Sequence, residues 1–92
     1  MIRSFHCKKT KALFNDIDVA KFRAFERFAR RKLMYLNRAR NLKDLRIPPQ
    51  NRLEALKGDR KGQYSIRIND QWRICFVWKN NEVYNVEITD YH

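Results

Sequence analysis

The sequence is poor in several features that mark whole classes of protein. Only two glycines, two prolines and two cysteines occur among its 92 residues. So little glycine and proline argues against disorder or low complexity, and two cysteines cannot build a disulfide framework. No apolar run approaches the length of about 18 residues that marks a membrane-spanning helix. The first residues lack the apolar core of a signal peptide. We therefore expect a cytoplasmic protein.

Common catalytic motifs are missing as well. There is no GxSxG, HExxH, CxxC or nucleotide-binding pattern, which removes the commonest hydrolase and cofactor classes. Cys7 and Cys75 lack the spacing of paired metal ligands, so we predict no metal site and no cofactor. Cys75 is expected to be a small, half-buried side chain within a strand.

Acidic residues are few relative to basic ones. Ten Asp and Glu stand against twenty-one Lys and Arg, which gives a formal net charge of +11. Such a balance predicts a polyanionic partner, with nucleic acid the leading candidate and an anionic membrane surface the lesser one. Six Phe, two Trp and four Tyr suffice for one core, and residues 1–92 make a single domain.

The hydrophobic pattern predicts an α+β domain in which an N-terminal strand and helices pack on an antiparallel sheet. Residues alternate between apolar and polar in three segments typical of sequential strands. A long helix with a stripe of apolar residues should cover the sheet, with Asp18 as its N-cap, and Thr10 could cap a shorter helix before it. The expected strands are 2–5, 63–68, 72–78 and 83–88, and the expected helices are 11–15 and 19–40, followed by an extended connection at 47–50 and an exposed loop at 58–62.

Shared apolar faces predict the pairing of these strands. Odd-length loops at 69–71 and 79–81 would place Arg67 opposite Arg73, Arg73 opposite Glu87, and Cys75 opposite Asn85. Like charges opposite one another on paired strands are unfavourable, so a bound anion would reduce the repulsion between the two arginines. Alternatively, Glu87 neutralises one of them and the face is only solvated. The arginines of the long helix have two interpretations too: a phosphate-tracking surface, or a soluble basic face that could meet an acidic protein.

One group of side chains could carry chemistry. It contains cations for a phosphodiester and groups able to move a proton, as metal-free RNA cleavage through the 2′-hydroxyl requires. Trp72 or Tyr91 could stack on a base. The group comprises Lys57, Arg67, Arg73, Asp90, Tyr91 and His92.

Three short motifs make the sequence recognisable. The segments LKGDR at 56–60, NDQWRI at 69–74 and DYH at 90–92 resemble the HigB toxins of the RelE-like superfamily, and the likeness runs the whole chain. The resemblance implies an α+β toxin that enters the ribosomal decoding site and cuts messenger RNA without a metal. It also implies a partner, a HigA-type helix-turn-helix antitoxin, through which alone the toxin would be connected to operator DNA. No membrane partner is expected.

The resemblance also implies roles for individual residues. Arg73 and the C-terminal Asp90-Tyr91-His92 correspond to the family's active site, and Lys57 to its basic loop residue. Some relatives carry a histidine where this chain has Glu54, which could accept a proton or only pair with a neighbouring cation. His92 is the first choice as general base, because an unperturbed imidazole titrates near about 6.5. Further RNA contacts are expected from Arg52, Arg60, Lys61, Arg67 and Trp72.

Two other functions fit the same sequence. The first is an RNA- or ribosome-binding module without catalysis, which the charge supports equally well. The second is an inactive family member that acts as a transcriptional co-regulator.

Overall fold

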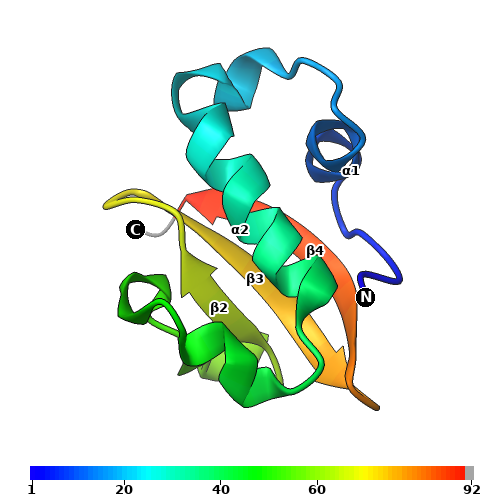
Figure 1. The fold of residues 1–92 in the computed structure, drawn as a ribbon, viewed down its shortest axis with the longest axis vertical. Coiled ribbons are helices and arrows are strands. Elements are labelled where there is room, and N and C mark those ends of the chain that lie inside the picture. The colour runs from blue at the N-terminus through cyan, green and yellow to red at the C-terminus, as the bar shows by residue number, and fades with distance from the viewer. Residues whose placement is uncertain (91–92) are drawn as a thin grey trace.

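The computed structural model describes residues 1–90, so the predictions for Tyr91 and His92 lie outside the described residues. It confirms the α+β class, with helices on one side of a four-stranded antiparallel sheet of order β1-β2-β3-β4 (Figure 1). No helix within residues 1–90 is long and apolar enough to cross a bilayer. The elements in chain order are α1 (Lys8–Phe14), the 3₁₀ helix η1 (Ala20–Phe25), α2 (Glu26–Arg38), η2 (Leu42–Arg46), η3 (Pro49–Asn51), β1 (Glu54–Ala55), η4 (Gly58–Arg60), β2 (Tyr64–Arg67), β3 (Trp72–Lys79) and β4 (Glu82–Asp90).

The first predicted hairpin is confirmed. Strands β2 and β3 pair with Arg67 opposite Arg73 and Ile66 opposite Ile74. Asn69 closes the connection, because its side-chain oxygen accepts hydrogen bonds from the backbone N–H groups of Gln71 and Trp72. Such local side-chain bonds are typical of Asn in tight turns.

The second predicted register is wrong. Arg73 lies opposite Thr89 and Cys75 opposite Glu87. The turn has two residues, Asn80 and Asn81, both with positive φ, as a hairpin turn of type I′ requires. This even-length turn would put the apolar residues of β4 on the wrong face. An irregularity in the β3–β4 pairing corrects the parity, and Asn85 there has a φ of 54°, which is typical of a β-bulge.

The N-terminal segments differ in detail from their predictions. The expected strand at 2–5 makes only two isolated parallel bridges to β4. The expected cap Thr10 instead lies inside α1, fully buried. Its hydroxyl accepts a hydrogen bond from the N–H of Ile88 at 3.0 Å, which ties α1 to β4.

The predicted long helix is divided into η1 and α2, and Asp18 does not cap either of them. Asp18 binds the guanidinium of Arg23 at 2.6 Å, and the backbone leaves helical geometry at Phe25 (φ −133°, ψ 18°). This break lets two phenylalanines of η1 reach the ring of Trp72, with ring centroids 6.0 Å away for Phe22 and 5.0 Å for Phe25.

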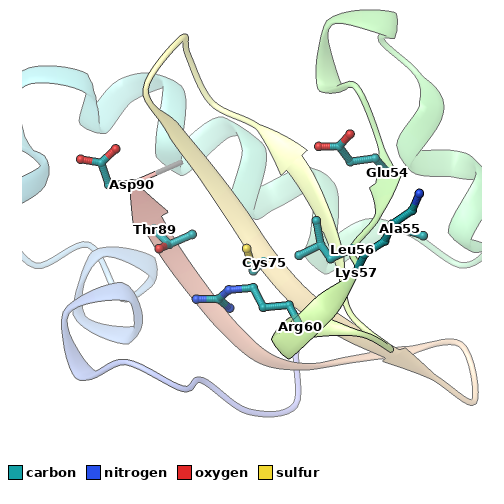
Figure 2. A pocket seen from close by; sticks show the side chains of 8 residues that line it. All are labelled: Glu54, Ala55, Leu56, Lys57, Arg60, Cys75, Thr89 and Asp90. Atoms are coloured by element: carbon teal, nitrogen blue, oxygen red, sulfur yellow. The ribbon is translucent and has the colours of Figure 1, made fainter. Parts of the chain in front are cut away.

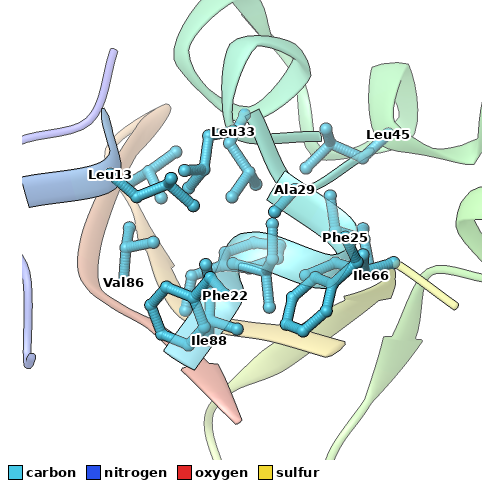
Figure 3. Close-up of a cluster of buried hydrophobic side chains, with 14 of the residues drawn as sticks. Leu13, Phe22, Phe25, Ala29, Leu33, Leu45, Ile66, Val86 and Ile88 are labelled. Carbon is cyan, nitrogen blue, oxygen red and sulfur yellow. The ribbon is translucent and has the colours of Figure 1, made fainter. Parts of the chain in front are cut away.

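The core lies between these helices and one face of the sheet (Figure 3). The predicted apolar stripe is confirmed, since every member is buried. The buried stripe consists of Phe22, Phe25, Ala29, Leu33 and Leu36, and the sheet adds Ile66, Ile74, Phe76, Val86 and Ile88.

A buried polar contact holds the connection between α2 and β1. The ammonium of Lys32 lies 2.5 Å from Oδ1 of Asn51. The amide of Asn51, which is fully buried, donates to the carbonyls of Leu45 and Ile47 at 3.1 and 3.3 Å. The connection expected to be extended contains η3, which begins at Pro49, so that prediction holds only for Ile47 and Pro48.

We expect the start of η2 to contribute pH-dependent stability. The carboxylate of Asp44 accepts hydrogen bonds from the N–H groups of Asn41 and Arg40, both at 3.0 Å, and these bonds hold the pKa of Asp44 below its usual value. Asp44 therefore contributes to folding stability at pH values above its unfolded pKa of about 4. This contribution is lost as the pH falls through its lower pKa in the folded state. The Asp44→Ala chain should melt below the wild type at neutral pH, and the difference should close in acid. Circular dichroism can measure the melting temperatures of both chains at several pH values. A difference in melting temperature that stays the same from neutral to acid pH would contradict this prediction.

Candidate functional site

A cleft of ≈ 670 Å³ lies against the sheet face that looks away from α2 (Figure 2). Ile74 and Ile88 point into the core, so their odd-numbered neighbours Cys75 and Thr89 face the cleft, where they form part of its lining. The edge strand β1 and the loop after it make one wall, and the end of β4 makes another. The lining residues are Glu54, Ala55, Leu56, Lys57, Arg60, Cys75, Thr89 and Asp90.

Arg73 lies two residues before Cys75 on β3, outside the lining of the cleft, and only 7% of its surface is exposed. Its Nε donates to Oγ of the fully buried Ser65 at 2.8 Å, and its Nη2 donates to the carbonyl of Arg52 at 2.7 Å. Arg52 has left-handed backbone geometry (φ 46°). A carboxylate oxygen of Glu54 lies 3.3 Å from the same nitrogen. A buried charge requires such partners, so the orientation of Arg73 is strongly determined.

Glu54, rather than the expected Glu87, therefore supplies a carboxylate to Arg73, which corrects the predicted pairing. Glu87 instead lies 3.2 Å from the guanidinium of Arg60. Arg60 also donates to the side chain of Gln63 at 3.1 Å. In Figure 2, the Arg60 guanidinium extends toward β4. These contacts make Arg60 a cation that is fixed in place within the cleft.

Lys57 contributes a second, more exposed cation. It precedes the predicted exposed loop, in which Gly58 and Gly62 have φ values of 64° and 94°. Positive φ favours glycine, so these two residues let the chain turn between β1 and β2. Figure 2 shows the Lys57 amine directed outward along β1, away from Cys75.

Asp90 ends β4 opposite Trp72 and also lines the cleft. Its Oδ2 accepts a hydrogen bond from the side chain of Gln71 at 3.0 Å. In Figure 2, Asp90 and Glu54 lie on opposite sides of β3. The structure therefore brings Glu54, Lys57, Arg60 and Asp90 around one cleft.

Other predicted RNA contacts lie apart from the cleft lining. Arg67 pairs with Asp70 within the β2–β3 hairpin. Trp72 is stacked on Phe25 on the core side of the sheet, and Lys61 is exposed in its loop without lining the cleft. Arg52 reaches the site through its carbonyl. Their contacts with RNA stay predictions.

Sequence reasoning missed the odd-numbered residues that surround Arg73. Neither Ser65 nor Thr89 was predicted as a site residue, although strand alternation places Ser65 beside Arg67 on the face away from the core. Cys75 was expected to be half-buried but is only 1% exposed. Burial raises the pKa of the Cys75 thiol, so it remains neutral and is a poor nucleophile. Within residues 1–90, no three His, Cys, Asp or Glu side chains are grouped as metal ligands.

A family model described as "RelE-like toxin of type II toxin-antitoxin system HigB" matches residues 3–92. The chain belongs to the HigB-like toxin family. Among curated relatives, this HigB-like chain is 49% identical over 55 residues to "Toxin HigB-1" of Vibrio cholerae, covering 60% of the chain and 58% of that protein. It is 44% identical over 41 residues to "Endoribonuclease HigB" of Proteus vulgaris, covering 45% of each. The matched segments thus span about half of these relatives' lengths.

Solved structures confirm the fold. Chains from two structures of the YoeB-YefM toxin-antitoxin of Staphylococcus aureus, one described as a heterotetrameric complex, superpose with TM-scores of 0.59 and 0.54. Each alignment covers 100% of the HigB-like chain and 98% of the other, at 19% and 18% sequence identity. At such identities the likeness concerns the fold alone.

Proposed function

We propose that this HigB-like chain is a ribosome-dependent endoribonuclease that cuts messenger RNA and so inhibits translation. The observation that carries the proposal is the cleft, in which cations and carboxylates lie together on a member of a toxin family. Lys57 and Arg60 supply positive charge at its wall, and Glu54 and Asp90 supply groups that can exchange a proton. A phosphodiester needs both kinds of group for cleavage by its own 2′-hydroxyl.

The proposed reaction forms a bond between the 2′-oxygen and the adjacent phosphorus and breaks the bond from phosphorus to the 5′-oxygen. A base removes the 2′-hydroxyl proton, and an acid protonates the departing 5′-oxygen. Lys57 and Arg73 neutralise charge on the phosphate as it develops, and Tyr91 positions the phosphate. The products are a 2′,3′-cyclic phosphate and a 5′-hydroxyl.

We assign the base to His92 rather than Glu54. Protonation of Glu54 would sacrifice its charge pairing with Arg73, which lies 3.3 Å away. Glu54 then serves to hold Arg73, while Asp90 orients His92 or exchanges a proton itself. An imidazole with an ordinary pKa near about 6.5 exchanges protons readily at neutral pH.

The proposed partners follow from the same family membership. A helix-turn-helix antitoxin of HigA type would hold the toxin inactive and connect it to operator DNA. The ribosomal decoding site would present the message. The net charge of +11 supports an RNA-rich partner, because long-range attraction between opposite charges speeds association.

Controlled expression of the chain without antitoxin tests this function. We expect growth arrest, together with new 5′ ends that map within translated codons. The upstream fragments should end in a 2′,3′-cyclic or 3′-phosphate, which end-specific ligation distinguishes from a 3′-hydroxyl. The Arg73→Ala chain serves as the inactive control, and Lys11→Ala, an exposed change on α1, as the active one.

The same experiment separates the two alternatives. Arrest with intact messages would show ribosome binding without cleavage. Absence of arrest from a folded chain would instead indicate an inactive co-regulator. Either result would overturn the proposed nuclease.

A further inference from the structure

A second groove, of ≈ 520 Å³, lies on the other side of the edge strand β1. It is bounded by η2, by the start of β2 and by the β3–β4 hairpin, and these elements lie at the lower end of the sheet in Figure 1. Tyr64 and Trp78 belong to the even-numbered residues of their strands, on the same side as the core, whereas Cys75 faces the cleft. The groove is lined by Asn41, Leu42, Lys43, Arg46, Leu53, Glu54, Ala55, Tyr64, Trp78 and Asn81.

The two hollows share a boundary. Glu54 and Ala55, the whole of β1, line both the cleft and the groove. Both residues are exposed, and successive side chains of a strand point to opposite faces. Because β1 is only two residues long and one of them is alanine, it forms a narrow divider that an extended polymer could cross.

The side chains of the groove suit unpaired nucleotides. Tyr64 is stacked on Phe76, with ring centroids 6.1 Å apart, and is itself only partly buried. Trp78 is likewise half-buried and packs against the edge of the core. Lys43 and Arg46 are exposed on η2 and make no ion pair within residues 1–90. Aromatic rings beside cations are typical of surfaces that bind single-stranded nucleic acid.

We propose that this groove is a second RNA subsite, which binds one or more unpaired nucleotides of the strand that occupies the cleft. Bases stack on Trp78 and Tyr64, and Lys43 and Arg46 contact the phosphates. The strand passes over Ala55 between the two hollows. This inference rests on the proposed function in one respect, namely that RNA is the ligand of the cleft.

Fluorescence titration tests the stacking without requiring catalysis. The probe is a single-stranded 2′-O-methyl oligoribonucleotide, which cannot be cut through its 2′-oxygen. We expect it to quench tryptophan emission of the wild type. Trp78→Phe, which leaves Trp72 as the remaining tryptophan, should lose the part of the quenching that comes from Trp78. Trp78→Ala should weaken binding by about fivefold or more, since base stacking contributes at least about 1 kcal/mol.

A matched pair of double variants separates the groove from general charge. Lys43→Ala/Arg46→Ala and Lys9→Ala/Lys11→Ala each remove two exposed positive charges, the latter on α1. Both should fold, which circular dichroism can verify. Only the groove pair should lower the slope of log affinity against log salt, by about 0.7 for each phosphate that the protein no longer neutralises. The α1 pair should change it little.

Three outcomes would overturn the subsite. Both double variants could lose the same RNA affinity, or the oligonucleotide could fail to quench the wild type. Alternatively, the groove pair could bind RNA normally but bind the antitoxin more weakly, which would make the groove a protein-docking surface. Failure of the nuclease function looks different. It would give intact messages in cells while the quenching and the groove-specific weakening of RNA binding remain.

Discussion

Replacing Arg73 with alanine is expected to abolish growth arrest and to slow message cleavage by about 10²–10³-fold, the usual cost of one electrostatic contact in a transition state. Arg73 is buried and oriented by Ser65, Arg52 and Glu54, so its guanidinium is fixed in orientation. The measurement is the rate of cleavage on translating ribosomes, together with growth after induction.

Two further variants make this prediction specific. Arg73→Lys keeps the charge but loses the fork of donors, so it should recover little activity. Ser65→Ala removes only the acceptor for Nε and should cause a smaller loss of activity, whereas Ser65→Thr, which retains a hydroxyl, should restore part of it. A merely structural role for Ser65 would lower stability without affecting cleavage by the folded fraction.

Folding must be checked in the same variants, because Arg73 is an ion-pair partner within the sheet. Circular dichroism and binding to the antitoxin would identify chains that have become inactive through unfolding. Full toxicity of a folded Arg73→Ala chain would refute the role assigned to Arg73.

Replacing Phe22 with alanine is expected to destabilise the protein by about 3–5 kcal/mol, as is typical of a buried phenylalanine. Phe22 is 1% exposed and its ring packs on Phe25 and Trp72. Each kcal/mol lowers the Tm of a domain of this size by roughly 4–8 °C, so the melting temperature should fall by more than about 10 °C. Thermal denaturation followed by circular dichroism measures this shift.

Phe28 offers a matched control for that change. It is the same residue type six positions further on, but it is 51% exposed on α2. Phe28→Ala should therefore change stability by only about 0.5 kcal/mol or less. Similar costs for the two variants would show that Phe22 is not part of the main core.

The strands were predictable because the alternation of apolar and polar side chains identifies a strand even when its exact pairing is mistaken. The register of the second hairpin was not predictable. The polar run at 79–81 suggested a three-residue loop, but two asparagines with positive φ and an irregularity near Asn85 give the same apolar faces. Parity alone cannot distinguish these solutions. The break in the helix at Phe25 could not be predicted for a similar reason. The spacing between Phe22 and Phe25 also fits a continuous helix.

The candidate site was predictable in its residue types but less so in its contacts. Motifs identified Lys57, Arg73 and Asp90, while the partner of Arg73 depended on a strand of only two residues that carries no periodic signal. Glu54 meets Arg73 because β1 pairs with β2 at Ser65. Such contacts between segments distant along the chain arise from tertiary packing, and the predictions for Tyr91 and His92 lie outside the described residues.

The bridges from Ile2 to Val83 and from Phe5 to Val86 have a consequence for synthesis on the ribosome. The first segment of the growing polypeptide can find these partners only after β4 has left the exit tunnel. Until then, the apolar stripe of α2 has no complete sheet to cover it. The fold of residues 1–90 is therefore completed late, because these pairings join segments that lie far apart along the chain.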